Sequence, residues 1–278
     1  MKHFLIALAG LWLGSTGLLA HADTRDDFPS CYQTLGKDAP QQGAPERELF
    51  VLIDETVDAD ERIQQSVIEK TLRFIRPGDA LEVVRFAAFT GDHYSRLMLK
   101  GRIDERLSED QRYSISKRAL NSFDSCFQRQ ATYVKRQLGK AINDSFGDHP
   151  DIPKTELAGN LAAISTLVRN SEAEQKVVLL FSDMLENSDL TSFYQRGNVR
   201  TIDPDQELAR LDRAGLESEW DGARVYIIGA GLIAQGNKAA YRSERTMDRL
   251  KTFWAGYFER GNAHLEGWGS PMLLEDLH

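Results

Sequence analysis

Two short stretches decide the fold: Glu48-Leu-Phe-Val-Leu-Ile53, which runs into Asp54, and Lys176-Val-Val-Leu-Leu-Phe-Ser182, which runs into Asp183. Each stretch is too short for a core helix, and neither alternates apolar with polar residues. Such runs are typical of strands that are covered on both faces of a parallel sheet. Residues 224–228 predict a further strand of the same kind.

Amphipathic segments separate these strands. Apolar residues recur at helical spacing over 60–76, 108–146, 157–168 and 238–259, and the second of these segments forms one helix or two. Strand patterns at 81–89 and 94–103 flank Thr90-Gly91-Asp92 and predict a hairpin. The alternation predicts a doubly wound α/β fold, with a mostly parallel central sheet, helices on both faces and one antiparallel edge strand.

The first 22 residues have the features of a cleaved signal peptide. Lys2 precedes an apolar stretch that is too short to span a membrane, and Ala20-His21-Ala22 supplies an A-x-A cleavage site. We expect export to the periplasm and no integral membrane span after cleavage, although full secretion would leave the same signal. We divide the rest into an extended arm or linker at 23–47 and one domain at 48–278, with a polar insertion at 184–222.

Charge and cysteine content narrow the functional classes. The formal net charge is −8, which disfavours nucleic-acid binding because that binding depends on Lys and Arg neutralising phosphates. Cys31 and Cys126 are the two cysteines of an exported chain, so we expect them to form a disulfide. This bond would tie the N-terminal arm to the helical segment at 108–146.

Oxygen-bearing side chains follow the buried strands. Asp54, Thr56 and Asp58 come after the first strand, Asp183 comes after the fourth, and Thr155 lies just before a helix. Ligands of open α/β sheets bind where the carboxyl ends of the strands meet. Carboxylate and hydroxyl oxygens suit Mg²⁺, Ca²⁺ or Mn²⁺ better than Zn²⁺. We therefore predict a divalent-cation site made of these five residues.

The order of these motifs resembles the von Willebrand factor type A domain family. That family carries D-x-S-x-S after its first strand, a Thr in a middle loop and an Asp after its fourth strand, which together form a metal-ion-dependent adhesion site. Here Thr56 replaces the first Ser and Asp58 the second, so this is a variant of that site. An added carboxylate would strengthen cation binding and weaken the attraction for a partner's acidic side chain.

The resemblance implies a non-enzymatic module that binds an as yet unidentified protein partner in the cell envelope. The insertion at 184–222 would lie beside the site and set specificity.

Other interpretations of the same residues stay open. Asp58 is also placed to cap the following helix together with Glu61, and Thr155 could be an ordinary helix cap. The site could be a metal-free remnant on a scaffold, or the carboxylates could serve a Mg²⁺-dependent hydrolase. The run Gly229-Ala-Gly231-Leu-Ile-Ala234 matches a dinucleotide fingerprint, but no apolar helix follows it promptly, so we interpret it as a turn.

Overall fold

The computed structural model describes residues 25–89, 92–146, 155–195, 198–233 and 243–278. The predicted signal peptide, 1–22, lies outside these residues. The strands are β1 (Arg47–Asp54), β2 (Ala80–Phe89), β3 (Asp92–Arg102), β4 (Gln175–Phe181), β5 (Tyr194–Gln195), β6 (Asn198–Val199), β7 (Ala223–Ile228) and β8 (Ala263–Trp268). The helices are the 3₁₀ helix η1 (Cys31–Asp38), α1 (Glu61–Phe74), α2 (Glu109–Ser114), α3 (Lys117–Ser145), α4 (Leu157–Arg169), α5 (Pro204–Ala214) and α6 (Glu244–Arg260).

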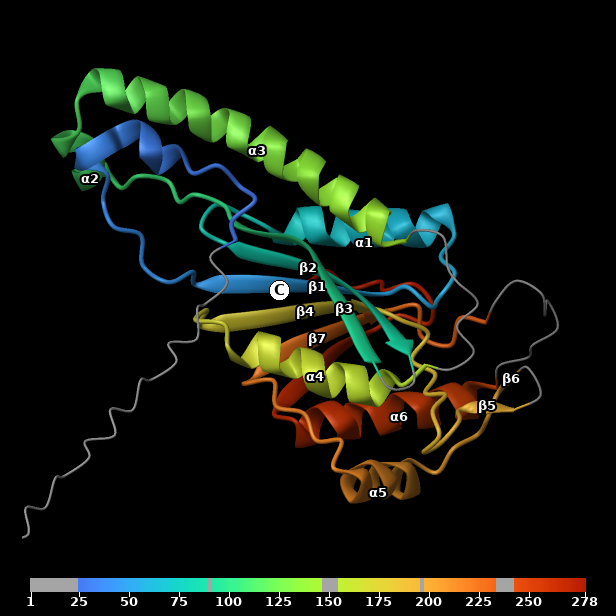
Figure 1. Cartoon of the computed structure of the whole chain (residues 1–278). Coiled ribbons are helices and arrows are strands. Elements are labelled where there is room, and N and C mark those ends of the chain that lie inside the picture. Colours follow the sequence, from blue (N-terminus) through green and yellow to red (C-terminus); the bar gives the residue numbers. More distant parts are fainter. Residues whose placement is uncertain (1–24, 90–91, 147–154, 196–197, 234–242) are drawn as a thin grey trace, which may run out of the picture.

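Six of the described strands form one sheet in the order β3-β2-β1-β4-β7-β8. Every neighbouring pair is parallel except β2 and β3, which form the antiparallel edge. Helices cover both faces, with α1 and α3 on one side and α4, α5 and α6 on the other (Figure 1). The predicted fold class, a doubly wound α/β sheet with one antiparallel edge strand, is therefore confirmed.

The uninterrupted apolar run of β1 reflects burial on both faces of the sheet. Leu49, Val51 and Ile53 pack in the core beneath α1 and α3, whereas Phe50 and Leu52 pack in the core beneath α4 and α6. Successive side chains of a strand point to opposite faces. Because both faces are covered, every position of the run can be apolar.

The segment before β1 is packed against the fold, which differs from the extended arm or linker that the sequence predicts. Cys31 and Leu35 of η1 are buried beside Phe123 of α3. The predicted disulfide is present and joins Cys31 to Cys126 of α3. The segment at 108–146, which the sequence predicts as one helix or two, forms two helices. Ser116 caps α3 and so separates it from α2.

Residues 25–27 lie along the outer edge of β3. The Asp27 backbone N–H donates to the Lys100 carbonyl at 2.7 Å, and the Lys100 N–H donates to the Asp27 carboxylate at 3.0 Å. The Arg25 guanidinium donates to the Leu97 carbonyl at 3.0 Å. Backbone groups that β3 would otherwise leave unpaired at the sheet edge are thus used within the chain.

The insertion at 184–222 contributes to the core, although the sequence pattern predicts a polar segment. Seven of its apolar side chains are buried against the face that α4 and α6 cover: Met184, Leu185, Phe193, Ile202, Leu208, Leu211 and Trp220. The insertion also contains the helix α5. No helix within the described ranges combines the length and the apolar content that a membrane span needs.

Candidate functional site

The carboxyl ends of β1 and β4 lie side by side at one edge of the sheet. Ile53 is paired with Phe181 in parallel register, so the next residues along each strand, Asp54 and Ser182, are neighbours. The Ser182 hydroxyl donates to Asp54 Oδ2 at 2.8 Å. We call the side chains gathered here, Asp54, Thr56, Thr155, Ser182 and Asp183, the strand-end cluster.

Asp54 is completely buried, and its hydrogen bonds with described residues come from neutral groups. Its Oδ1 accepts the Thr56 backbone N–H at 3.0 Å and the Thr56 hydroxyl at 2.6 Å. Burial raises the pKa of the Asp54 carboxyl, and the hydrogen bonds from Thr56 and Ser182 only partly oppose this rise.

Thr155 reaches the cluster from the loop before α4. Its Oγ1 lies 3.4 Å from the Thr56 Oγ1. Thr155 and Asn187 exchange two backbone hydrogen bonds of 3.0 and 2.9 Å, so the insertion holds this loop in place. Thr155 is not the helix cap that the alternative interpretation proposed. Glu156 has the N-cap position without a side-chain bond, and the buried Glu186 accepts the Ala158 N–H at 2.8 Å instead.

Asp183 follows β4 and is nearly as buried as Asp54. Its Oδ1 accepts the Leu185 N–H at 2.8 Å, and its Oδ2 accepts the Tyr194 hydroxyl at 2.5 Å. Burial, and then the charge of Asp54, raise the pKa of the Asp183 carboxyl to about 7. The same burial, followed by the charge of Asp183, raises the pKa of the Tyr194 hydroxyl, which therefore stays protonated as a donor.

Two members of this arrangement were not predicted as site residues. Ser182 directly precedes Asp183, and its position at the end of a buried strand is a signal that could have identified it. Tyr194 lies eleven residues beyond Asp183 in the insertion. No sequence periodicity links those two positions, so only the folded loop brings the Tyr194 hydroxyl to the carboxylate.

Asp58 differs from this buried group in its exposure. Its side chain is exposed, whereas Asp54 and Asp183 are buried. The alternative that Asp58 caps the next helix is wrong: Asp60 is the N-cap of α1, and its carboxylate accepts the Ile63 N–H at 3.0 Å. The helix begins two residues later than that interpretation requires. The assignment of Asp58 as a cation ligand stays a prediction.

The strand-end cluster holds two buried carboxylates, and no positive side chain of the described residues is bonded to them. The hydrogen bonds of Asp54 and Asp183 that involve described residues come from hydroxyl and backbone N–H groups alone. Within the described part of the chain there is also no group of three or more His, Cys, Asp and Glu side chains placed to hold a metal. The donor set is thus two carboxylates and up to three hydroxyls, all hard oxygen donors.

The glycine-rich stretch after β7 forms a turn beside the cluster. The Gly231 N–H donates to the Asp183 carbonyl at 2.7 Å, and Gly229 and Gly231 have φ of 103° and 73°. A Cβ at Gly229 would meet the Ser182 carbonyl oxygen at 2.9 Å. The positive φ values and this close approach require glycine. The described part of the stretch therefore supports the interpretation as a turn.

Comparisons with known proteins add little to this geometry. No protein-family model matches the chain, and a search of the curated proteins finds no match. Among solved structures, the chain is similar to a crystal structure of an aerotolerance-related membrane protein from Bacteroides fragilis NCTC 9343 that carries multiple mutations to serine. The identity is 12%, the TM-score is 0.34, and the match covers 82% of this chain and 93% of the other. A likeness of this size carries no argument about function.

Proposed function

We propose that this chain is an exported protein-binding module that holds a divalent cation, Mg²⁺ or alternatively Ca²⁺ or Mn²⁺, at the carboxyl edge of its sheet. Asp54, Thr56, Thr155 and Asp183 would hold the cation, with Asp58 as an outlying fifth ligand. The bound cation would supply a positive charge that an acidic side chain of a partner can approach. We assign no catalytic residue.

One observation supports the proposal above the others: Asp54 and Asp183 are 0% and 7% exposed, and their hydrogen-bond donors among the described residues are all neutral. Placing ionised carboxylates out of water costs several kcal/mol each unless an opposite charge compensates. The raised pKa values of both groups express this cost. A divalent cation at the strand-end cluster would compensate both charges at once.

The insertion is the natural partner-recognition element of such a module. It touches the strand-end cluster twice, through the backbone pairing of Asn187 with Thr155 and through the Tyr194 hydroxyl on Asp183. A loop held this closely against the cluster can present both the cation and its own side chains to one partner.

Calorimetric titration of the purified chain with Mg²⁺, Ca²⁺ and Mn²⁺ tests the cation site. We expect saturable binding in the wild type and none in Asp183→Ala. Glu174→Ala is the matched control, because this exposed carboxylate lies just before the amino end of the same strand and should leave binding unchanged. Equal binding heats from the wild type and Asp183→Ala would contradict the proposed cation site.

Recovery of partners from envelope extracts tests the binding role. A partner retained by the wild type should be lost with a chelator and with Asp183→Ala. Assays with phosphoester substrates, with and without Mg²⁺, address the hydrolase alternative, and Mg²⁺-dependent turnover would replace the binding role with an enzymatic one. Fractionation of the producing cells tests the periplasmic location.

A further inference from the structure

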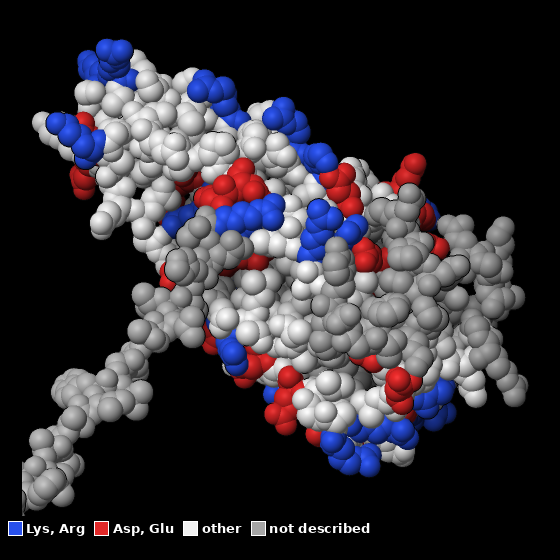
Figure 2. Space-filling view, viewed as in Figure 1, with Lys and Arg blue, Asp and Glu red and all other residues white. Residues whose placement is uncertain are grey.

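The long helix α3 differs in charge from the rest of the chain. It contains six Lys or Arg residues and two Asp residues, although the whole chain has a net charge of −8. Figure 2 shows Lys and Arg side chains along the ridge that α3 forms at the surface. Both of its carboxylates are already paired, Asp124 with Arg112 and Asp144 with Lys140. The ridge therefore has a surplus of positive charge.

A groove follows one flank of α3. It consists of two hollows of about 710 and about 250 Å³ that share Arg106, Phe127 and Ala131. The α3 residues that line it extend from Phe123 to Lys135, which is about 18 Å along a helix. We call this surface the α3 groove.

The floor of the α3 groove is apolar, and its lining includes four basic side chains and one carboxylate, Asp124. Ile103, Leu107 and Val134 are buried beneath it. Arg106 and Lys135 are exposed, and neither forms an ion pair with a carboxylate among the described residues. The Arg106 guanidinium lies over the Phe127 ring, 5.3 Å from its centre, so it is held at the junction of the two hollows.

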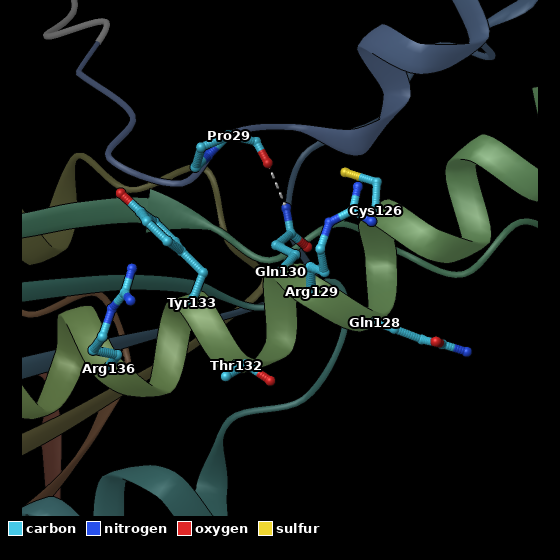
Figure 3. Close-up of a pocket in the computed structure, with 8 residues that line it drawn as sticks. All are labelled: Pro29, Cys126, Gln128, Arg129, Gln130, Thr132, Tyr133 and Arg136. Atoms are coloured by element: carbon cyan, nitrogen blue, oxygen red, sulfur yellow. Dashed lines mark hydrogen bonds between the residues drawn. The ribbon is translucent and has the colours of Figure 1, made fainter.

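The other flank of α3 is built differently. Its hollow, of about 570 Å³, lies between α3 and the segment around Pro29 (Figure 3). There Gln130 donates to the Pro29 carbonyl at 3.0 Å, and Arg129 donates to Ser125 at 2.6 Å. These polar groups are used in holding the N-terminal segment and the helix. In the α3 groove, Arg112 and Arg76 also pair with carboxylates, whereas Arg106 and Lys135 form no ion pair among the described residues.

We propose that the α3 groove is a second interaction surface, and that it binds an acidic amphipathic segment of a partner protein. The apolar floor would take the apolar side of that segment, and Arg106 and Lys135 would pair with its carboxylates. Arg, together with aromatic side chains, is the residue type most enriched at the energetic centre of protein interfaces. A concave surface of this length fits a peptide segment better than a flat lipid surface. The proposal does not depend on the cation site.

Fluorescence anisotropy with a labelled amphipathic peptide of Leu and Glu, about 15 residues long, tests the α3 groove. We expect Arg106→Glu with Lys135→Glu to weaken binding at least tenfold. Arg213→Glu with Lys251→Glu is the matched control, since it makes the same charge change at exposed positions of α5 and α6, and it should stay within twofold. Ala131→Trp, at an exposed position in the centre of the groove, should weaken binding without changing the charge.

Three outcomes would overturn the proposal. Equal losses from the two double variants would reduce the binding to general electrostatics. Equal binding of a peptide with Lys in place of Glu would contradict the charge complementarity. A dimer in sedimentation that Ala131→Trp dissociates would assign the groove to a second copy of this chain. A chelator should leave peptide binding unchanged, which separates this test from that of the cation site.

Discussion

At the amino end of β1, Arg47 and the buried Asp79 form an ion pair of 2.5 Å, and the Arg47 guanidinium also donates to the Phe74 carbonyl and lies over the Phe74 ring. At the carboxyl end of the same strand, Asp54 is equally buried, but its donors in the described part of the chain are Thr56 and Ser182 alone. One end of the strand buries a compensated charge, and the other buries a charge that nothing described compensates.

We interpret this difference as one between a structural use of a carboxylate and the functional use that we propose for Asp54 and Asp183. A buried pair with its own counter-charge is complete within the chain, whereas two carboxylates with neutral donors need a proton or a cation from outside. We therefore expect a bound cation to stabilise the chain at the carboxyl edge.

The largest expected effect is the loss of the compensating charge, that of Arg47. Arg47→Met would leave Asp79 buried without its partner, so we expect the free energy of unfolding to fall by about 3 to 5 kcal/mol. Chemical denaturation measures this change. Arg62→Met, which removes a partner of Asp60 at the surface, should cost less than about 1 kcal/mol. Similar losses from both variants would contradict the contrast between buried and exposed pairs.

The buried carboxylates at the carboxyl edge of the sheet predict that the stability of the chain depends on pH. The pKa of Asp183 is raised from 3.8 to about 7 in the folded chain, so folding favours its protonated form. The resulting stabilisation is complete below about pH 4 and is lost as the pH rises through 7. At 1.36 kcal/mol per pKa unit it amounts to roughly 4 kcal/mol.

Asp183→Asn tests this assignment, because it keeps the shape and removes the titration. We expect a flatter stability profile between pH 4 and pH 7 in the absence of added cation. Glu186 has a pKa raised to about 7 as well, so part of the slope should remain in the variant. An unchanged profile would show that Asp183 does not carry this effect.

Divalent cations should stabilise the wild type. A cation at one hundred times its dissociation constant adds about 2.7 kcal/mol to the free energy of unfolding if it binds only the folded chain. Thermal unfolding with and without Mg²⁺ measures this. The increment should vanish in Asp183→Ala and persist in Glu174→Ala. Stabilisation of Asp183→Ala by the same amount would place the cation elsewhere.

The smallest expected effect concerns Asp58. Because its side chain is exposed, solvent screens its charge, and we expect Asp58→Asn to weaken cation binding two- to fivefold, equivalent to about 1 kcal/mol or less. Calorimetric titration beside Asp183→Ala measures the difference. Complete loss of binding in Asp58→Asn would show that Asp58 is as important for cation binding as Asp183.

The sheet could be predicted from the sequence because the uninterrupted apolar runs of β1, β4 and β7 indicate strands that are buried on both faces. It also placed Asp54 and Asp183 at strand ends, which the parallel register then brings to one edge. These are properties of local pattern combined with a general rule of open α/β sheets.

The parts that could not be predicted depend on contacts between distant segments. Tyr194 reaches Asp183 only because the insertion folds back, and Thr155 is held by Asn187 rather than by its own helix. The helix cap was placed at Asp58 instead of Asp60 because two aspartates two residues apart offer the same local signal. The buried apolar side chains of the insertion are diluted among polar residues, so the pattern alone does not show a core segment.

The short stretch that runs beside β3 has a consequence for maturation. Arg25 and Asp27 are hydrogen-bonded to the backbone of Leu97 and Lys100. Arg25 is the third residue after the expected cleavage point at Ala22. Cleavage there would leave residues 25–27 in place along β3. Proteolytic removal of five more residues would expose the edge of β3 to other chains. The processing of the leader would then determine whether the mature protein stays monodisperse or self-associates edge to edge.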